Sequence, residues 1–458
     1  MTCRWNCMND NASTRSDEVL LNAVSRQVTS GGSYLLAYSG GLDSTVLLHL
    51  CVRLREQYGF SLRAAYVHHG LSAFADSWAQ HCAGQCSDWH VPFSVLPVQV
   101  DAQQGGIEAA AREARYQAIR KHLHMNEVLL TAQHLNDQSE TFLLALKRGS
   151  GPAGLSAMAS ATQFGEQTHL RPLLAFSRAQ LAEYAAHHDL SWIEDDSNND
   201  DRFDRNFLRR QVLPVLTQRW PHFPAAVSRS AELCAEQEQL LDELLAESLQ
   251  SLRRADGGLS ITALESYGPL RRAALLRRWL AAEGVRMPSR EQLQRLWQDV
   301  ALSRRDAEPQ LVLGPWQIRR FRDGLYVLPQ WTSVRDTVLT WEPASAPLAL
   351  PSELGTLALG PQGVAVRRPY PDEAVTVRFH AQGKFHIVGR DHGRQLKKLW
   401  QESGVAPWMR ERTPLIFYGE RLIAAMGTFV TREGRPESEN AAWRIVWHPA
   451  SLPSMRNF

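Results

Sequence analysis

Short apolar runs alternate with helical stretches between residues 31 and 214, and this alternation constrains the fold more than any other feature of the sequence. The apolar runs cover residues 34–38, 62–67 and 127–131, and the helical stretches include residues 42–55 and 137–147. Strands that alternate with helices of about 10 to 15 residues predict βαβ units and a parallel sheet. Ligands of such sheets bind beyond the carboxyl ends of the strands. All three runs end in glycine, histidine or other polar residues, so we expect a binding site at that edge.

The segment between the first strand and its helix has the composition of a phosphate-binding loop. Its residues are Ser39, Gly40, Gly41, Leu42, Asp43, Ser44 and Thr45. The two glycines let the backbone turn tightly and approach a ligand closely. The free N–H groups of the helix start, with the Ser44 and Thr45 hydroxyls, can donate hydrogen bonds to an anion. The loop differs from the common phosphate loop because it lacks the Gly-Lys-Ser/Thr lysine.

Asp43 points to a metal ion at this loop. Its carboxylate would repel a bound phosphate unless a cation lay between them, and carboxylates are preferred ligands of Mg²⁺. Asp43 is therefore a candidate magnesium ligand. The alternative is that Gly40 and Gly41 serve an ordinary strand-to-helix turn and that Asp43 caps the helix.

Composition bounds the class of protein. The 458 residues suggest about three domains at roughly 150 residues each. Hydrophobic residues make up 44% of the chain and charged residues 21%, which excludes a mostly disordered protein. The formal net charge is only +2, so a nucleic-acid site would have to be a local basic patch. The chain has neither an apolar run of about 18 residues nor a signal-peptide pattern, so we expect a cytoplasmic protein without a membrane segment.

The sequence divides into five parts. We expect an N-terminal extension (1–30), a Rossmann-like α/β domain with a parallel sheet (31–218), a mainly helical domain (219–340), a linker (341–361) and a small α/β C-terminal domain (362–458). Leucines between residues 233 and 252 recur at three- and four-residue spacing, which is typical of a core-facing helix. Residues 311–328 alternate around Asp323-Gly324 and predict a hairpin. Repeated prolines favour a linker over 341–361.

The phosphate loop and several other motifs resemble a known family. Residues 39–45 resemble the Ser-Gly-Gly-x-Asp-Ser signature of the N-type ATP pyrophosphatases, the PP-loop superfamily, which adenylate an oxygen and release pyrophosphate. Other motifs resemble the bacterial tRNA(Ile)-lysidine synthetases, over residues 106–116, 134–141 (HLNDQSET), 147–151, 171–174, 192–198, 205–206, 396–400 and 407–415 (PWMRERTPL). Ser139 stands where the family more often has alanine, and about thirty residues at the N-terminus match no family motif.

The resemblance implies an enzyme that attaches free L-lysine to C2 of the wobble cytidine, position 34, of the tRNA(Ile) with the CAU anticodon. ATP activates the base by adenylation, Mg²⁺ is the implied cofactor, and AMP and pyrophosphate are released. The implied partners are therefore this tRNA, L-lysine and ATP, without a membrane. Residues 219–340 and 362–458 are implied to bind the tRNA. The sequence is compatible with a monomer or a homodimer.

Four residues besides Asp43 are predicted to be catalytic: His134, Asp137, Glu140 and Arg205. The first three have i, i+3, i+6 spacing, so consecutive members can share a helix face. A lysine amine is mostly protonated at neutral pH, and a nearby carboxylate or imidazole could accept its proton. The spacing does not tell which residue is the base, and ordinary helix N-terminal chemistry is the alternative. The resemblance places Arg205 at the rim of the active site. The acidic cluster that precedes Arg205 would repel the RNA backbone, so it either recognises the cationic lysine or does not contact the RNA.

Seven basic residues are predicted to bind phosphate or tRNA: Arg112, Arg115, Lys147, Arg148, Lys397, Lys398 and Arg410. Arg112 and Arg115 suit a phosphate of ATP or tRNA, and the alternative is a solvated helix face. Lys147 and Arg148 suit either the β- and γ-phosphates or the anticodon backbone. The remaining three, with Arg394 and Arg412, form a local basic cluster predicted to grip the tRNA body.

Two other functions compete with this reading. Another enzyme of the superfamily is the first, but a thiolase needs paired redox cysteines and an amidotransferase needs a glutaminase domain. Cys82 and Cys86 are wrongly spaced for a redox pair, and we predict buried, inert thiols there. The second competitor is a catalytically silent tRNA-binding protein, against which the intact loop 39–45 and Asp137 argue.

Overall fold

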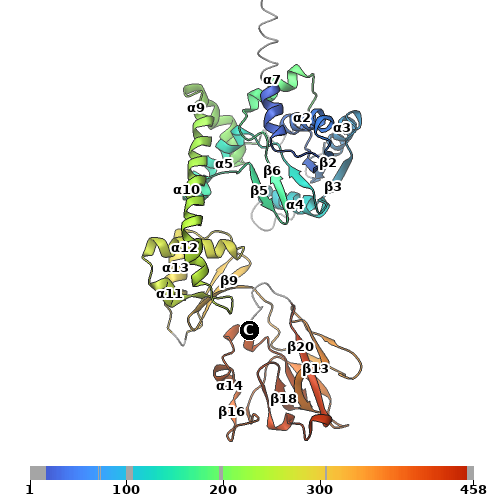
Figure 1. The fold of residues 1–458 in the computed structure, drawn as a ribbon, viewed down its shortest axis with the longest axis vertical. Coiled ribbons are helices and arrows are strands. Elements are labelled where there is room, and N and C mark those ends of the chain that lie inside the picture. Colours follow the sequence, from blue (N-terminus) through green and yellow to red (C-terminus); the bar gives the residue numbers. More distant parts are fainter. Residues whose placement is uncertain are drawn as a thin grey trace, which may run out of the picture. The chain divides into compact units, whose positions relative to one another are not determined.

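The computed structural model describes residues 17–70, 72, 74–99, 107–194, 200–304 and 307–450. The chain forms two compact units, Met1–Leu241 and Asp242–Phe458 (Figure 1). Residues 195–198 of the family-like segment 192–198 lie outside the described residues. Among the helices of the described parts, none combines the length and the apolar character that crossing a bilayer requires.

A six-stranded sheet forms the centre of the first unit, in the order β3-β2-β1-β4-β6-β5. Its strands are β1 (Ser33–Ala37), β2 (Ser61–His68), β3 (Phe93–Pro97), β4 (Val128–Leu130), β5 (Ala161–Phe164) and β6 (Gln167–Leu170). All neighbouring strands are parallel except β5 and β6, and Leu36 of β1 pairs with both Ala64 of β2 and Leu130 of β4. The predicted parallel sheet and its three strands are therefore confirmed.

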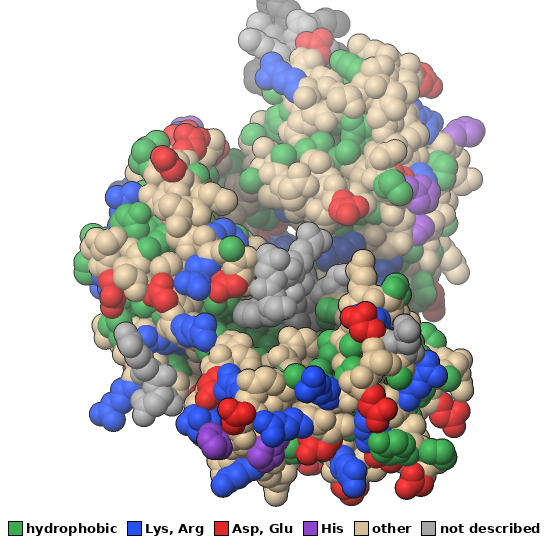
Figure 2. Space-filling view, turned by 60° about the horizontal axis from the view of Figure 1, so that its bottom comes forward, with side chains coloured by type: hydrophobic (Ala, Val, Ile, Leu, Met, Phe, Trp, Pro, Cys, Tyr) green, Lys and Arg blue, Asp and Glu red, His purple; other side chains and the backbone are tan. Residues whose placement is uncertain are grey.

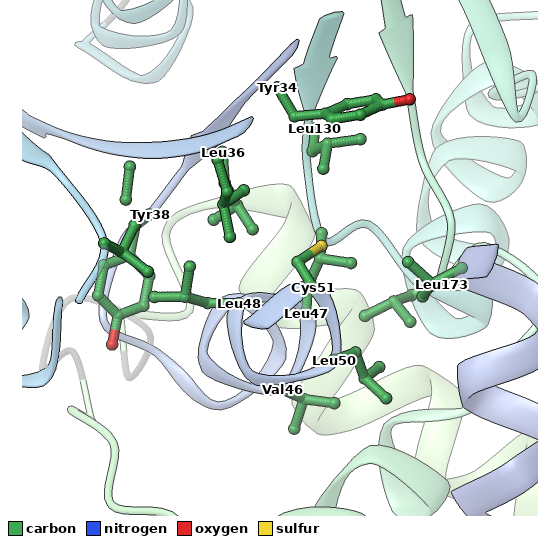
Figure 3. Packing of buried hydrophobic residues seen from close by; sticks show 14 of the residues in the cluster. Tyr34, Leu36, Tyr38, Val46, Leu47, Leu48, Leu50, Cys51, Leu130 and Leu173 are labelled. Atoms are coloured by element: carbon green, nitrogen blue, oxygen red, sulfur yellow. The ribbon is translucent and has the colours of Figure 1, made fainter. Parts of the chain in front are cut away.

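Helices cover both faces of this sheet. The helices are a first one over residues 17–25, α2 (Leu42–Tyr58), α3 (Ala75–Asp88), α4 (Ile107–His122), α5 (Leu135–Lys147), α6 (Pro152–Leu155) and α7 (Arg178–His187). Successive side chains of β1 point to opposite faces, so Leu36 packs with α2 and Leu35 packs against α4. The α2 face holds the larger core, with Leu47 and Leu50 fully buried (Figure 3). Because α2 follows β1 directly in the chain and packs on the sheet, it begins beside the carboxyl end of β1.

The first unit ends in α8 (Asp204–Phe207), a π-helical turn η2 (Leu208–Val212), α9 (Leu213–Arg219) and the first part of the long α10 (Phe223–Leu252), whose last residues belong to the second unit. The leucine stripe of α10 was expected to face a core, and this is correct only for its C-terminal end, where Leu245 and Leu252 are buried. Leu233, Leu240, Leu241 and Leu244 are exposed by 40–65%. Spacing predicts which residues share a helix face, but it does not tell whether another element covers that face.

The second unit begins with a region that combines helices and a sheet. Its elements are β7 (Leu259–Ser260), α11 (Ile261–Glu265), α12 (Pro269–Ala282), α13 (Arg290–Arg295), a π-helical turn η3 (Leu296–Ala301), β8 (Gln310–Leu313), β9 (Trp316–Phe321) and β10 (Gly324–Pro329). The strands form an antiparallel sheet in the order β7-β10-β9-β8, and Phe321 pairs with Gly324 across the predicted hairpin. The hairpin is confirmed. Trp279 and Leu280 of α12 lie in the core between helices and sheet.

The rest of the second unit is built mainly of short strands. They are β11 (Val338–Thr340), β12 (Leu348–Ala349), β13 (Thr356–Arg367), β14 (Val375–Arg378), β15 (Lys384–Phe385), β16 (Arg394–Gln395), β17 (Leu415–Tyr418), β18 (Arg421–Ala425), β19 (Phe429–Val430) and β20 (Ala442–His448), with helices α14 (Leu396–Glu402) and α15 (Pro407–Arg410). The expected linker over 341–361 differs from the structure. Trp341, Leu350 and Leu357 of this segment are buried in the core, because apolar residues between the prolines form β12 and the start of β13.

Candidate active site

The phosphate loop turns sharply where β1 meets α2. Gly40 has a φ of +77°, a conformation that favours glycine. A Cβ atom at Gly40 would lie 2.6 Å from Cδ1 of Ile193 and 2.8 Å from Sγ of Cys82. The N–H of Ile193 donates to the Gly40 carbonyl at 2.8 Å. The loop is therefore held against the segment around residue 193, and only glycine fits at position 40.

This packing predicts different costs for two neighbouring substitutions. Gly40→Ala should lower the free energy of unfolding of the first unit by about 2 kcal/mol or more, because it combines overpacking with an unfavourable backbone conformation. Gly41→Ala should cost less than about 1 kcal/mol, because Gly41 has a φ of −74° and its nearest neighbouring atom would be 3.6 Å from the added Cβ. Urea unfolding of the two variants measures the difference. Equal costs would contradict the contact with Ile193 and Cys82.

The hydroxyls of the loop are engaged within the loop itself. Ser44 Oγ donates to the Gly41 carbonyl at 3.0 Å and lies 3.0 Å from Ser39 Oγ. Thr45 is fully buried and its Oγ1 donates to the Gly40 carbonyl at 3.3 Å. The prediction that the Thr45 hydroxyl offers a hydrogen bond to an anion is therefore wrong, because that hydroxyl is inaccessible. The backbone N–H groups at the start of α2 remain the anion donors that the fold provides.

Asp43 in the first turn of α2 faces His134 at the start of α5. His134 Nε2 lies 3.6 Å from Oδ2 of Asp43 and 3.5 Å from Oδ2 of Asp137. His134 is buried, and its Nδ1 accepts a hydrogen bond from the Asn136 N–H at 3.2 Å, so it caps α5. Burial alone would lower the pKa of His134, but the hydrogen bond to Asp43 and the charges of Asp137, Asp43 and Glu140 together raise it. His134 thus joins the phosphate loop to the acidic start of α5.

The carboxylate of Asp43 fits a magnesium ion. Its Oδ1 is buried and has no hydrogen-bond partner among the described residues, although a buried polar atom normally has one. A hard carboxylate oxygen beside a phosphate-binding loop has the chemistry that Mg²⁺ requires. The orphaned oxygen supports the prediction that Asp43 is a metal ligand, and His134 is the neighbour that would orient the other oxygen.

Glu140 is the most buried acid of the site, and it is paired with an arginine that the sequence analysis did not select. Arg209 donates from Nε to one oxygen of Glu140 at 2.8 Å and from Nη2 to the other at 3.0 Å. The same Nη2 lies 3.2 Å from Oδ1 of Asp137. Burial raises the pKa of Glu140, and the Arg209 hydrogen bonds and charge oppose that rise. Arg209 therefore binds both acids of α5.

Arg205, which the resemblance placed at the rim, makes a different contact. It lies on α8, and its Nη2 donates to Thr141 Oγ1 at 3.1 Å. The sequence signal for Arg209 is its i+4 spacing from Arg205, which places both arginines near one face of a helix. In the structure they contact two consecutive residues of α5, Glu140 and Thr141. The resemblance directed attention to Arg205 alone.

Arg112 and Arg115 lie on α4, near the carboxyl ends of β2 and β6. The Arg112 guanidinium lies 5.0 Å from the centre of the Tyr116 ring, and Arg115 Nε donates to His69 Nε2 at 3.4 Å. Buried Arg171, which follows β6, adds a third guanidinium, and its charge interacts with that of Arg112. This edge of the sheet therefore carries positive charge, and binding of a phosphate by the two arginines of α4 stays a prediction.

Lys147 and Arg148 lie at the opposite end of α5 from His134. The 13 residues of α5 rise about 1.5 Å each, so roughly 20 Å separates the two ends of the helix. Lys147 Nζ is 2.7 Å from Asp204, and both Lys147 and Arg148 are exposed. The structure does not bring them to the phosphate loop, and contact with the anticodon backbone is the alternative that stays a prediction.

The basic cluster predicted near the C-terminus does not converge on one surface. Lys397 and Lys398 are exposed on α14. Arg410 is only 16% exposed and lies 3.7 Å from Glu308, and Arg412 is buried with its guanidinium over the Trp331 ring. The prediction was wrong for these two arginines, because Arg410 pairs with Glu308 and Arg412 packs on Trp331 instead of facing solvent. Figure 2 shows a face of the molecule on which basic and acidic side chains are interspersed.

The parallel sheet, the loop at the end of β1 and the acids at the start of α5 define an ATP pyrophosphatase of the PP-loop class. Residues 10–216 match the model of the PP-loop domain. Residues 259–326 match the TilS substrate binding domain, and residues 375–447 match the TilS substrate C-terminal domain. The chain belongs to the tRNA(Ile)-lysidine synthase family, which confirms the resemblance inferred from its motifs.

Relatives in this family are similar over nearly their whole length. A protein of Pectobacterium atrosepticum named tRNA(Ile)-lysidine synthase is 65% identical over 434 residues, which cover 95% of this chain and 99% of the relative. A protein of the same name from Serratia proteamaculans is 60% identical over 425 residues, covering 93% and 97%. A third, from Shigella flexneri, is 55% identical over 426 residues, covering 93% and 98%.

Proposed function

We propose that this protein is an ATP-dependent ligase that joins L-lysine to C2 of the wobble cytidine of the CAU-anticodon tRNA(Ile), through an adenylated tRNA. The observation that carries the proposal is the pairing of a complete phosphate loop with the acids of α5, through Asp43 and His134, in a chain that is 65% identical to a named tRNA(Ile)-lysidine synthase. We also propose a cytoplasmic location, because the proposed substrates are tRNA, ATP and free lysine.

In the first step, the cytosine C2 oxygen attacks the α-phosphate of ATP and pyrophosphate leaves. The loop N–H groups and the start of α2 hold the phosphates, because unpaired N–H groups and the helix dipole both favour an anion there. Bound Mg²⁺, held by Asp43, would neutralise charge on the leaving pyrophosphate. Arg112 and Arg115 supply positive charge at the same edge of the sheet. The contribution of the protein is thus positioning and charge stabilisation.

In the second step, the lysine amine attacks C2, a proton is lost and AMP leaves. Asp137 is the acid we assign to the incoming amine, because its side chain is 13% exposed whereas that of Glu140 is fully buried. Both oxygens of Glu140 are occupied by Arg209, so Glu140 positions that arginine beside Asp137. Asp137 then orients the ammonium group and can accept its proton.

Replacing Asp137 by asparagine should impair lysine transfer more than adenylation. Asparagine retains the shape but loses the charge that attracts the ammonium group, and we expect a fall in the transfer rate of about 100-fold or more. Adenylated tRNA formed without lysine is measured in one assay, and its consumption after lysine is added is measured in a second. Equal losses in both assays would reassign Asp137 to ATP or metal binding.

In the C-terminal part of the chain, we propose that the exposed Lys397 and Lys398 contact the tRNA, without the largely buried Arg410 and Arg412. Their joint replacement by glutamine should reduce the slope of log affinity against log salt for full-length tRNA by about 0.9 per lost phosphate contact. Arg410→Gln is the matched control, because Arg410 is largely buried and lies beside Glu308, and it should leave the slope unchanged. An unchanged slope in the lysine variant would remove these residues from the tRNA interface.

The direct test of function is incubation of the purified protein with unmodified tRNA, ATP, Mg²⁺ and labelled lysine, followed by nucleoside analysis. We expect one labelled lysine-modified cytidine per tRNA and none when ATP is omitted or when the tRNA carries uridine at position 34. A sulfur-containing product would favour a thiolase, but Cys82 and Cys86 are both fully buried on α3, as predicted for inert thiols. Binding of tRNA without any product would favour the silent binding protein. Sedimentation of the same preparation decides between monomer and homodimer.

A further inference from the structure

A second group of metal-ligating side chains lies away from the phosphate loop, where the first helix meets the end of α7. Asp17 stands at the start of the described part of the first helix, and His187 and His188 are consecutive residues at the end of α7. Oδ2 of Asp17 lies 2.8 Å from Nδ1 of His187 and 2.8 Å from Nε2 of His188. The three ligand atoms all lie within 4.8 Å of one another. Two imidazole nitrogens and a carboxylate oxygen thus converge on one point.

The carboxylate of this group is buried against the two imidazoles. Asp17 is only 6% exposed, and an ionised carboxylate at that depth needs a positive partner or a metal. Within the described parts of the chain, the ion-pair partners of Asp17 are these two histidines, which are cations only when protonated. A divalent cation at the point of convergence would give the buried carboxylate a positive partner.

In the described parts of the chain, the surroundings of the group include the cation Arg53 and the polar rings of Tyr184 and His49. Arg53 of α2 is exposed, and its Nη1 lies 3.3 Å from Nε2 of His188 and 3.2 Å from the hydroxyl of Tyr184. The His49 ring packs on that of His188, with 5.0 Å between the ring centres. Among the residues that the structure describes, Arg53 is a cation that would oppose a metal ion here, and its side chain is exposed.

We infer that Asp17, His187 and His188 form a binding site for a first-row transition metal of the zinc type, which fastens the first helix to α7. Imidazole with a carboxylate suits Zn²⁺, Co²⁺ or Ni²⁺ better than Mg²⁺, which prefers oxygen ligands and water. Three protein ligands leave a fourth tetrahedral position for water. Leu20 and Val24 of the same helix are buried in the core of the first unit, so a metal would add to an existing contact.

The experiment uses the full-length protein without a histidine tag, stripped of metal with a chelator. Titration with Co²⁺ should give the visible absorption of a tetrahedral or five-coordinate site, and Zn²⁺ should displace it with a dissociation constant of about 1 µM or tighter. Zn²⁺ at a hundredfold excess over that constant should raise the melting temperature by roughly 5 °C. Neither readout depends on catalysis.

Three variants separate a metal site from a plain hydrogen-bonded cluster. His187→Gln with His188→Gln retains donors to Asp17 but removes both ligands, and it should weaken Zn²⁺ binding at least about 100-fold while the protein stays folded. Arg53→Gln removes the opposing charge and should tighten binding by about 3- to 10-fold, more at low salt. His222→Gln, on an exposed histidine elsewhere in the same unit, should change nothing.

Two results would overturn the inference. One is a dissociation constant for Zn²⁺ above about 100 µM in the wild-type protein. The three side chains would then form a hydrogen-bonded cluster that binds no metal. The other is unchanged Co²⁺ absorption in the double glutamine variant, which would move the bound metal to another site such as Asp43 and His134. If the double variant does not fold, absence of a Zn²⁺-dependent rise in the melting temperature of the wild-type protein decides against the site on its own.

Discussion

Replacing Asp43 by alanine should lower the rate of tRNA adenylation by at least about 100-fold, which is the scale of losing one electrostatic catalytic group. The physical reason is that Asp43 carries the buried, unpartnered oxygen beside the phosphate loop and the second oxygen that faces His134. The fold should be retained, because Asp43 is partly exposed and the loop is held by Gly40, Ser44 and Ile193. Release of pyrophosphate during single-turnover adenylation, without lysine, measures the effect.

The matched control for this variant is Asp88→Ala. Asp88 is an exposed aspartate at the C-terminal end of α3 in the same unit, and its loss should leave adenylation unchanged. Raising the Mg²⁺ concentration should restore the Asp43→Ala variant only slightly, since the lost group is the ligand itself. Near-normal turnover of that variant at saturating Mg²⁺ and ATP would exclude Asp43 as the metal ligand.

Replacing Arg209 by methionine should destabilise the first unit by about 3–5 kcal/mol at neutral pH, because it leaves Glu140 as an unpaired buried carboxylate. The pKa of Glu140, already raised by burial, should rise further without the opposing Arg209. A carboxyl whose folded pKa lies above its unfolded value loses stability as the pH rises through the folded pKa. The free energy of unfolding of the variant should therefore be higher near pH 5 than at pH 7.5, as measured by urea unfolding.

The double variant Arg209→Met with Glu140→Gln distinguishes the charge from the packing. Removing both charges should recover most of the lost stability and flatten its dependence on pH, because no buried carboxylate remains. Lysine transfer should stay impaired in the double variant, since Asp137 has lost the guanidinium that holds it. If the double variant is as unstable as the single one, the effect of Arg209 comes from its packing and not from its charge.

The sequence predicts the first unit well because its signals are local. The strands β1, β2 and β4 are mainly apolar runs, and the glycine pair marks the turn at Gly40. The types of these elements and the edge that carries the site therefore follow from short segments. Family motifs then select His134, Asp137 and Glu140, which the structure brings together.

What the sequence does not predict depends on contacts between distant segments. The partner of Glu140 is 69 residues away, at Arg209, and only the path of the chain after residue 200 decides that Arg209 and not Arg205 reaches it. The low exposure of Arg410 likewise depends on a distant segment, because its partner Glu308 is more than a hundred residues earlier. The leucines of α10 have the right spacing for a core face, and the fold leaves more than half of them exposed. Burial is a property of the assembled fold and has no local signal at these positions.

The π-helical turn at Leu208–Val212 determines which side of the helix axis the side chains of the following helix, α9, point to. A π turn holds one residue more than an α turn, and such turns recur at functional sites. Deleting one residue within it would restore a regular helix but rotate the downstream residues by about 100° relative to Arg205, the angle between successive residues of an α-helix. Because Arg209 sits inside this turn, its reach to Glu140 depends on that extra residue. The segment should therefore accept changes of side chain at its outward positions far more readily than any change of length.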